Sequence, residues 1–283
     1  MTSTIQADPA TATLSVEQVK AFHDNGYHIL PGFLPDDLNR RLKAEIDQFV
    51  EDHRAKPIDP YAKQQQAPRK MQLEYHEHGF LLTEPRLMAI LGQLMGGAEF
   101  SLHHLHTARH DAGCGGVCWH HDYEQIPQTN RSHLMVHVFF YLNGLDGTIG
   151  DLMILPGSHH KVMERDGMAA FATADLPGAK VIDDVPPGTA IIVHSAMMHA
   201  RRAKPGGVGR PRYFIDSSYC QAGVQWPSFG REHLEHMMTR AKALGLGRGG
   251  RYDFVFDPAR FYPADEGRDR LEAVNTGSLV QRL

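Results

Sequence analysis

The segment Trp119-His120-His121-Asp122-Tyr123 holds side chains that are suited to binding a metal ion. In an extended segment the side chains alternate between faces, so His120 and Asp122 point to one side and His121 points away. One imidazole and one carboxylate at this spacing can bind the same ion, and a third ligand must come from elsewhere. Two histidines and one carboxylate with open coordination positions form the ligand set of non-haem Fe(II) oxygenases.

The number of histidines supports a metal site. The chain has 19 histidines among 283 residues, and eight of them fall between His103 and His137. Histidine is the commonest side-chain ligand of metals in proteins. A His-x-Asp pair also arises by chance in a chain so rich in histidine, so the context of the pair decides its meaning.

A candidate for the third ligand is His199, which lies 77 residues beyond Asp122. It follows a turn at Pro187-Gly188 and the apolar stretch 190–193, an arrangement that delivers a histidine at the end of a buried strand. Arg210 and Arg212 come about a dozen residues later. An arginine there could reach back to the metal and hold a carboxylate through two parallel hydrogen bonds.

These residues need a scaffold, and the pattern of the chain predicts a mainly β fold with flanking helices. Ser15 and Gln18 form a capping box for a helix that ends at Gly26. Further helices are predicted over about 35–53, after Thr83, and over about 231–244. Between them lie short extended runs separated by turn residues, which are typical of a β-sandwich or barrel. The runs are Glu99–His106, Leu134–Leu142, Leu152–Leu155, Lys180–Ile182, Ala190–His194 and Tyr213–Tyr219.

We expect one catalytic domain over residues 1–283, without a clear internal boundary. It divides into a helical N-terminal part (1–98), a β core (99–220), and a C-terminal helix and tail (221–283). Residues 55–70 are polar and contain three prolines. We interpret them as a mobile lid over the site.

Composition excludes several classes of partner. The formal net charge is -4 and the isoelectric point is about 6.5, so neither a nucleic acid nor an anionic membrane is an expected partner. No apolar run has the length of a membrane span, and the N-terminus does not have the pattern of a secretion signal. Three cysteines are too few for a disulfide framework and favour a reducing compartment, the cytoplasm.

Two groups of residues have more than one interpretation. Cys114 and Cys118 could mimic half of a zinc site, but without a second pair they are better explained as thiols in a tight loop. Arg201, Arg202 and Lys204 could be a solvated loop, or they could receive an anionic substrate at the mouth of the site.

Taken together, the chain resembles the phytanoyl-CoA dioxygenase family of Fe(II)/2-oxoglutarate oxygenases over about residues 15–220. The matching motifs are Phe22-x-x-x-Gly26-Tyr27, Trp119-His120-x-Asp122, Gly150-x-Leu152, Pro156-Gly157-Ser158-His159, Pro187-Gly188-Thr189, Met198-His199-Ala200, and Pro211-Arg212 with Tyr219 seven residues later. The resemblance implies a double-stranded β-helix (jelly-roll) core and hydroxylation of small molecules.

The resemblance also implies roles for individual residues. His120, Asp122 and His199 would be the catalytic iron ligands, and Arg212 would bind the distal carboxylate of 2-oxoglutarate. Arg210 stands at the family's commoner spacing of eleven residues from the histidine and is the alternative to Arg212. The resemblance also implies two further cofactor contacts, Arg109 and His137.

Two departures from the family pattern concern the cofactor pocket and the substrate. Arg201 stands where relatives often have serine, which changes the detail of the cofactor pocket. The sequence after Asp122 lacks the extended signature of ectoine hydroxylases, so ectoine is not the expected substrate. Halogenating relatives have Gly or Ala at the position of Asp122, so its presence favours hydroxylation.

The expected function is therefore an Fe(II)/2-oxoglutarate-dependent dioxygenase that hydroxylates a small molecule with O2 and releases succinate and CO2. A non-catalytic jelly-roll that binds a metal or ligand is one alternative. A hydrolase or isomerase that uses zinc through the same residues is another. The sequence leaves the substrate and the oligomeric state open.

Overall fold

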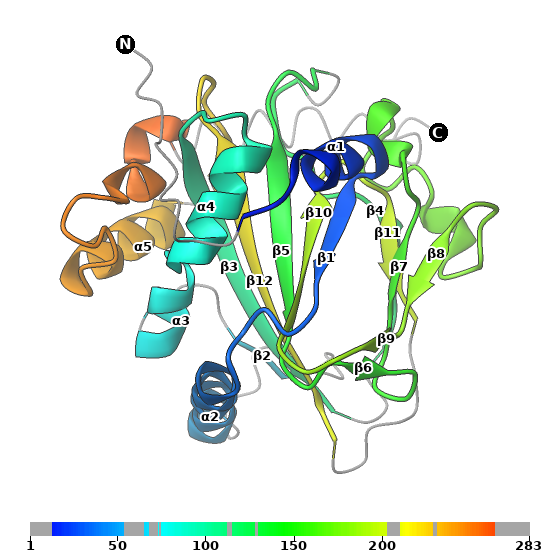
Figure 1. Ribbon diagram of the computed structural model, residues 1–283, viewed down its shortest axis with the longest axis horizontal. Coiled ribbons are helices and arrows are strands. Elements are labelled where there is room, and N and C mark those ends of the chain that lie inside the picture. The colour runs from blue at the N-terminus through cyan, green and yellow to red at the C-terminus, as the bar shows by residue number, and fades with distance from the viewer. Residues whose placement is uncertain are drawn as a thin grey trace.

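Two antiparallel β-sheets face each other in the computed structural model, and helices cover the outer side of the larger sheet (Figure 1). The structure describes residues 13–53, 65–67, 73, 75–111, 115–127, 130–202, 210–228 and 231–263. The predicted lid, residues 55–70, lies outside this part of the chain except for one short strand. Cys114 and Lys204 also lie outside it.

The larger sheet has six strands in the order β1-β10-β5-β12-β3-β2. Their bounds are Tyr27–Leu30 (β1), Thr189–His194 (β10), Met135–Tyr141 (β5), Arg212–Gln221 (β12), Phe100–His110 (β3) and Gln65–Ala67 (β2). The smaller sheet has the order β4-β11-β7-β8, with bounds Val117–His120, His199–Arg201, Leu152–Ile154 and Lys180–Ile182. A third, two-stranded pair joins β6 (Leu145–Asp146) to β9 (Asp184–Val185).

Among the described residues, five α-helices accompany the sheets. They are α1 (Val16–Asn25), α2 (Asp36–His53), α3 (His76–Leu81), α4 (Pro85–Leu94) and α5 (Arg231–Ala243). The predicted capping box at Ser15 and Gln18 is present, and Gly26 ends α1 with a φ of 86°. Helix α3 was not expected from the sequence. Short 3-10 turns complete the described elements at Ser158–His160, Ala169–Phe171, Asp253–Phe256 and Pro258–Arg260.

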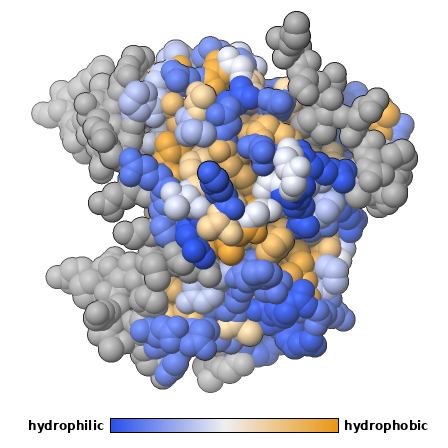
Figure 2. Space-filling view, turned by 90° about the vertical axis from the view of Figure 1, so that its left-hand side faces the viewer, coloured by the Kyte–Doolittle hydropathy of each residue, from blue (hydrophilic) through white to orange (hydrophobic). Residues whose placement is uncertain are grey.

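Figure 2 shows the helical side of the molecule, where hydrophilic residues surround hydrophobic ones near the middle of the view. None of the described helices combines the length and the hydrophobicity that crossing a membrane requires.

Side-chain alternation separates the hydrophobic core from the functional interior. In β5, Val136, Val138 and Phe140 pack toward the helices, in the same cluster as Leu87 and Leu91 of α4. The residues between them, His137, Phe139 and Tyr141, point to the space between the two sheets. The strand therefore delivers a histidine and two aromatic rings to the interior while its other face anchors the helices.

A β-bulge interrupts this alternation in β3. Ser218 of β12 pairs with His104, but the next residue, Tyr219, pairs with Leu102, so His103 is the inserted residue. Both Leu102 and Leu105 lie in the core under the helices. Because of the extra residue, His104, His106 and His110 all face the interior cavity.

Candidate metal centre

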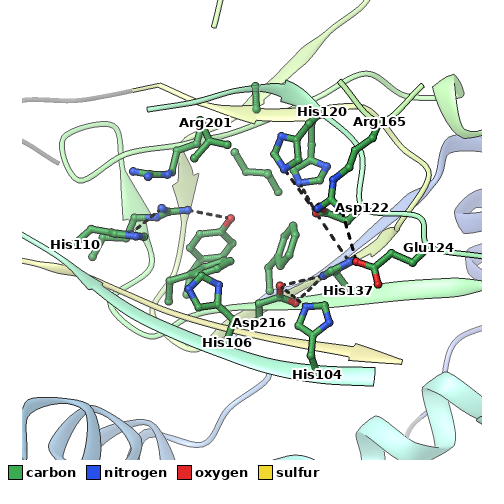
Figure 3. Close-up of a pocket in the computed structure, with 18 residues that line it drawn as sticks. His104, His106, His110, His120, Asp122, Glu124, His137, Arg165, Arg201 and Asp216 are labelled. Carbon is green, nitrogen blue, oxygen red and sulfur yellow. Dashed lines mark hydrogen bonds and ion pairs between the residues drawn. The ribbon is translucent and has the colours of Figure 1, made fainter. Parts of the chain in front are cut away.

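The smaller sheet brings His120 and His199 side by side. His120 is the last residue of β4 and His199 the first of β11, and the two are direct cross-strand partners. Asp122 follows β4 by two residues, in a segment held by a hydrogen bond from its backbone N–H to the carbonyl of Ser195 (2.7 Å). Oδ2 of Asp122 lies 3.7 Å from Nε2 of His120 and 3.3 Å from Nε2 of His199 (Figure 3).

Backbone carbonyls orient both imidazoles toward this point. Nδ1 of His120 lies 2.8 Å from the carbonyl of Cys118, and Nδ1 of His199 lies 3.1 Å from the carbonyl of Met197. A carbonyl oxygen only accepts, so each Nδ1 carries the proton and each Nε2 is left with its lone pair. Metal-binding histidines are fixed by backbone partners in this way.

The third ligand atom is held by a charged neighbour. Nη2 of Arg165 donates to Oδ1 of Asp122 over 2.7 Å, which leaves Oδ2 facing the two imidazoles. Burial opposes ionisation of Asp122, but its contacts with the neighbouring imidazoles, His199 first, hold its pKa well below the usual value. Burial lowers the pKa of His120 to about 4. A neutral imidazole and an ionised carboxylate are the states that bind a metal ion.

His121 points away from this cluster, as the alternation of an extended segment predicts. Its Nε2 donates to the carbonyl of Met163 (3.0 Å), and its Nδ1 accepts from the backbone N–H of Tyr123 (3.2 Å). The three converging side chains are thus His120, Asp122 and His199, and their donor set fits one divalent ion with coordination positions left open.

The triad lies in the wall of a cavity between the two sheets. The lining residues come from both sheets and from the loop that carries Arg165; they are His104, His106, His110, Val117, His120, Asp122, Glu124, His137, Phe139, Tyr141, Leu152, Arg165, His199, Ala200, Arg201, Arg212, Phe214 and Asp216.

Arg212 is a buried cation in this cavity, only 3% exposed. Its Nη1 donates to Nδ1 of His110 (3.1 Å) and its Nη2 to the hydroxyl of Tyr141 (3.4 Å), both uncharged partners. No carboxylate of the described residues forms an ion pair with it, and its Nε has no hydrogen-bond partner among them. Burial lowers the pKa of Arg212, yet an arginine stays protonated. A buried charge without a counter-ion marks a place for an anionic ligand.

The motif glycine Gly150 makes room for this arginine. Its φ is 115°, a conformation that favours glycine, and a Cβ atom there would lie 3.2 Å from Cδ of Arg212. The Gly150-x-Leu152 motif therefore shapes the anion pocket as well as the turn before β7.

Arg210 takes a different position. It precedes β12, its side chain is 63% exposed, and it forms an ion pair with Asp146 on the surface (2.7 Å). Of the two arginines that the sequence offered, Arg212 is the one that lines the cavity.

The two remaining predicted contacts lie on opposite faces of the larger sheet. His137 of β5 lines the cavity, with Nδ1 hydrogen-bonded to Asp216 (2.9 Å). Arg109 is not brought to the cavity, because it lies on the other face of β3 from His110 and pairs with Asp47 (2.9 Å) and Asp111 (3.2 Å). Its guanidinium thus ties β3 to helix α2.

Several cavity residues were not predicted as site residues. Arg165 belongs to a loop with no motif, and Tyr141, His110, Glu124 and Asp216 carry no spacing signal. Arg201 and Arg202 were interpreted either as part of a solvated loop or as residues that receive an anionic substrate. In the structure Arg201 lines the cavity, and Arg202 forms an ion pair with the buried Asp151 (2.6 Å).

Comparisons with known proteins identify the family of this chain. The family model of phytanoyl-CoA dioxygenase (PhyH) matches residues 22–206, so the chain belongs to this family and the resemblance seen in the motifs is confirmed. A comparison with curated protein sequences gives no match.

Solved structures of similar fold include proteins with 2-oxoglutarate bound and one described as dependent on it. HygX from Streptomyces hygroscopicus, with nickel and 2-oxoglutarate bound, is 16% identical with a TM-score of 0.62, over 78% of this chain and 91% of its own. The carbocyclase SnoK from nogalamycin biosynthesis is 18% identical with a TM-score of 0.62, over 78% and 90%. EctD from S. alaskensis, with 2-oxoglutarate and 5-hydroxyectoine, is 18% identical with a TM-score of 0.59, over 82% and 87%. These likenesses confirm the predicted jelly-roll core with flanking helices.

Proposed function

We propose that this protein is an Fe(II)- and 2-oxoglutarate-dependent dioxygenase that hydroxylates a C–H bond of a small molecule and releases succinate and CO2. The observation that supports it most is the presence of two complementary features in one cavity: a 2-His-1-carboxylate cluster and a buried arginine without an acidic partner. Membership of the phytanoyl-CoA dioxygenase family supports the same activity.

In this proposal His120, Asp122 and His199 hold the iron, and Arg212 binds the distal carboxylate of 2-oxoglutarate. When bound, the iron and 2-oxoglutarate together supply the activation of O2. The forked guanidinium suits a carboxylate because it offers two parallel hydrogen bonds. Tyr141 and His110 fix its orientation, and the neutral state of His110 suits this role because burial holds its pKa well below the usual value.

Part of the cavity wall is apolar. Phe139, Phe214 and Leu152 line the cavity between the triad and the arginine. The guanidinium of Arg212 lies over the rings of Tyr141 and Phe214, 5.1 and 5.0 Å from their centroids. Apolar walls exclude water and strengthen each charge interaction inside the cavity.

Hydroxylation is favoured by Asp122, because a third protein ligand occupies the position that a halide would need. Other oxidations, such as the ring closure named for SnoK, use the same kind of site, so the reaction type depends on how the substrate is placed. The sparse cysteines favour a cytoplasmic location for this activity, and among the described residues Cys118 and Cys220 are free thiols.

The experiment is a screen of small metabolites for succinate release and O2 consumption with Fe(II), ascorbate and 2-oxoglutarate. We expect a productive substrate to raise both rates together in the wild type and in Arg210→Ala, and neither rate to rise in His199→Ala. Metal binding without any 2-oxoglutarate turnover would favour the non-catalytic alternative. Turnover that needs zinc and no 2-oxoglutarate would favour a hydrolase or isomerase.

A further inference from the structure

A second cluster of two histidines and one carboxylate lies beside the first. It consists of His104 on β3, His137 on β5 and Asp216 on β12, three strands that are neighbours in the larger sheet. All three side chains are buried, and each offers a ligand atom within 4.8 Å of the other two. The positions are rigid, because Ser218 of β12 pairs with both histidines.

Hydrogen bonds fix the ring orientations on the β3 side of this cluster. Nε2 of His103 lies 2.7 Å from the carbonyl of Pro227 and donates to it. Nδ1 of His103 lies 2.8 Å from Nδ1 of His104, so a hydrogen bond joins the two rings. Nε2 of His104 therefore points the other way and faces Oδ2 of Asp216 at 3.7 Å.

The β5 side places one imidazole between two carboxylates. Nδ1 of His137 lies 2.9 Å from Oδ1 of Asp216, while its Nε2 faces Oδ2 of Asp122 at 4.0 Å (Figure 3). Nε2 of His137 is buried and has no hydrogen-bond partner among the described residues.

The surroundings add negative rather than positive charge. Glu124 lies 3.2 Å from Nε2 of His103, and Asp122 closes the other side. Arg165 is the fixed cation that contacts both of these carboxylates, at 2.7 Å from Asp122 and 3.6 Å from Glu124. Three carboxylates thus surround the two imidazoles beside one arginine, and ligand atoms from three strands converge between them.

We infer that a divalent metal ion binds between His104, His137 and Asp216, at a site separate from the first triad. One such ion can bind Nε2 of His104, the carboxylate of Asp216 and Nδ1 of His137 at once. An N–H on Nε2 of His137 then faces Asp122 and links the two sites. His103 has the place of the outer partner that orients a metal-bound histidine. Imidazole and carboxylate donors suit a first-row ion such as zinc, manganese or iron.

Metal counting tests this site without using enzymatic activity. Chelator-stripped protein is dialysed without oxygen against Co(II) alone, and the bound metal per chain is measured. We expect two ions in the wild type, one in His104→Gln, one in His199→Ala and none in the double variant. His106→Gln is the matched control, because His106 is the next cavity histidine on β3 and lies outside the cluster; it should keep two.

A second variant separates loss of the site from loss of the fold. Asp216→Asn keeps the shape of the side chain but removes its charge, and thermal unfolding reports whether each variant is folded. We expect folded Asp216→Asn to bind one ion. A single ion in the wild type that persists in His104→Gln and disappears in His199→Ala overturns the second site and leaves the proposed function intact. Two ions in both His104→Gln and Asp216→Asn also overturn it, while retention of both ions in His199→Ala counts against the first site.

Discussion

Arg165 donates a hydrogen bond from Nη2 to Oδ1 of Asp122 over 2.7 Å, from a loop outside both sheets. The backbone carbonyl of Arg165 also accepts the N–H of His121, so the loop is anchored to the segment that carries the carboxylate. The contact fixes which oxygen of Asp122 faces the two imidazoles. The geometry of the proposed iron site therefore depends on a residue that does not touch the metal.

Replacing Arg165 should loosen the metal. We expect Arg165→Ala to weaken Co(II) binding at the first site by roughly 10–100-fold, the usual cost of losing a partner that orients a ligand. Arg165→Lys should recover part of the loss, since it restores charge without the fork. The affinity is measured by titration in the His104→Gln background, with Arg210→Ala as the surface-arginine control; an unchanged affinity in Arg165→Ala would remove its role.

Arg212 should control binding of 2-oxoglutarate. Removing one member of a buried charge pair costs about 3–5 kcal/mol, so Arg212→Ala should weaken 2-oxoglutarate binding by roughly a hundredfold or more. Arg210→Ala should have little effect, because its ion pair with Asp146 is on the surface. Titration of both variants with 2-oxoglutarate in the presence of metal compares the two arginines. A larger loss of affinity in Arg210→Ala than in Arg212→Ala would mean that Arg212 does not bind the distal carboxylate of 2-oxoglutarate.

The hydroxyl of Tyr141 should make a smaller contribution. It accepts a long hydrogen bond of 3.4 Å from Arg212, and such a bond is worth about 0.5–1.5 kcal/mol. Tyr141→Phe should therefore weaken 2-oxoglutarate binding by no more than about tenfold and leave metal affinity unchanged. A hundredfold loss in the same titration would mean that Tyr141 contacts the ligand itself.

His121 should make the stability of the metal-free protein depend on pH. Burial lowers the pKa of His121 to about 4, below the ordinary 6.5, so the unfolded state binds more protons between these values. Its contribution is then fully present above pH 6.5 and is lost as the pH falls toward 4, by about 3 kcal/mol in total. The free energy of unfolding, measured with urea at several pH values between 5 and 7, should change less with pH in His121→Gln than in the wild type. An equal change with pH in the two proteins would contradict the prediction.

The sequence predicts the parts of this site that depend on local spacing. The sequence indicates the positions of His120, Asp122 and His199 and of the turn glycines, because each motif is short and each strand is bounded by turn residues. The side-chain direction of Arg212 also follows, because Tyr213, Ile215 and Tyr219 form the apolar face of the same strand and leave Arg212 on the other.

The unpredicted parts depend on contacts between distant segments. Arg165 reaches Asp122 through a loop without a pattern, so no local rule could assign it. The bulge at His103 changes which residues of β3 face inward, and both faces of the strand near Arg109 are polar. Sequence alternation alone therefore could not show that Arg109 faces helix α2 rather than the cavity.

The central claim can be tested before the substrate is known, by following visible absorption when 2-oxoglutarate is added to the Fe(II)-loaded protein without oxygen. Chelation of iron by the keto acid gives a metal-to-ligand charge-transfer band. We predict this band in the wild type and in Arg210→Ala, its appearance only at much higher 2-oxoglutarate concentration in Arg212→Ala, and its absence in His199→Ala. A wild-type protein that binds Fe(II) but shows no band at saturating 2-oxoglutarate would contradict the account.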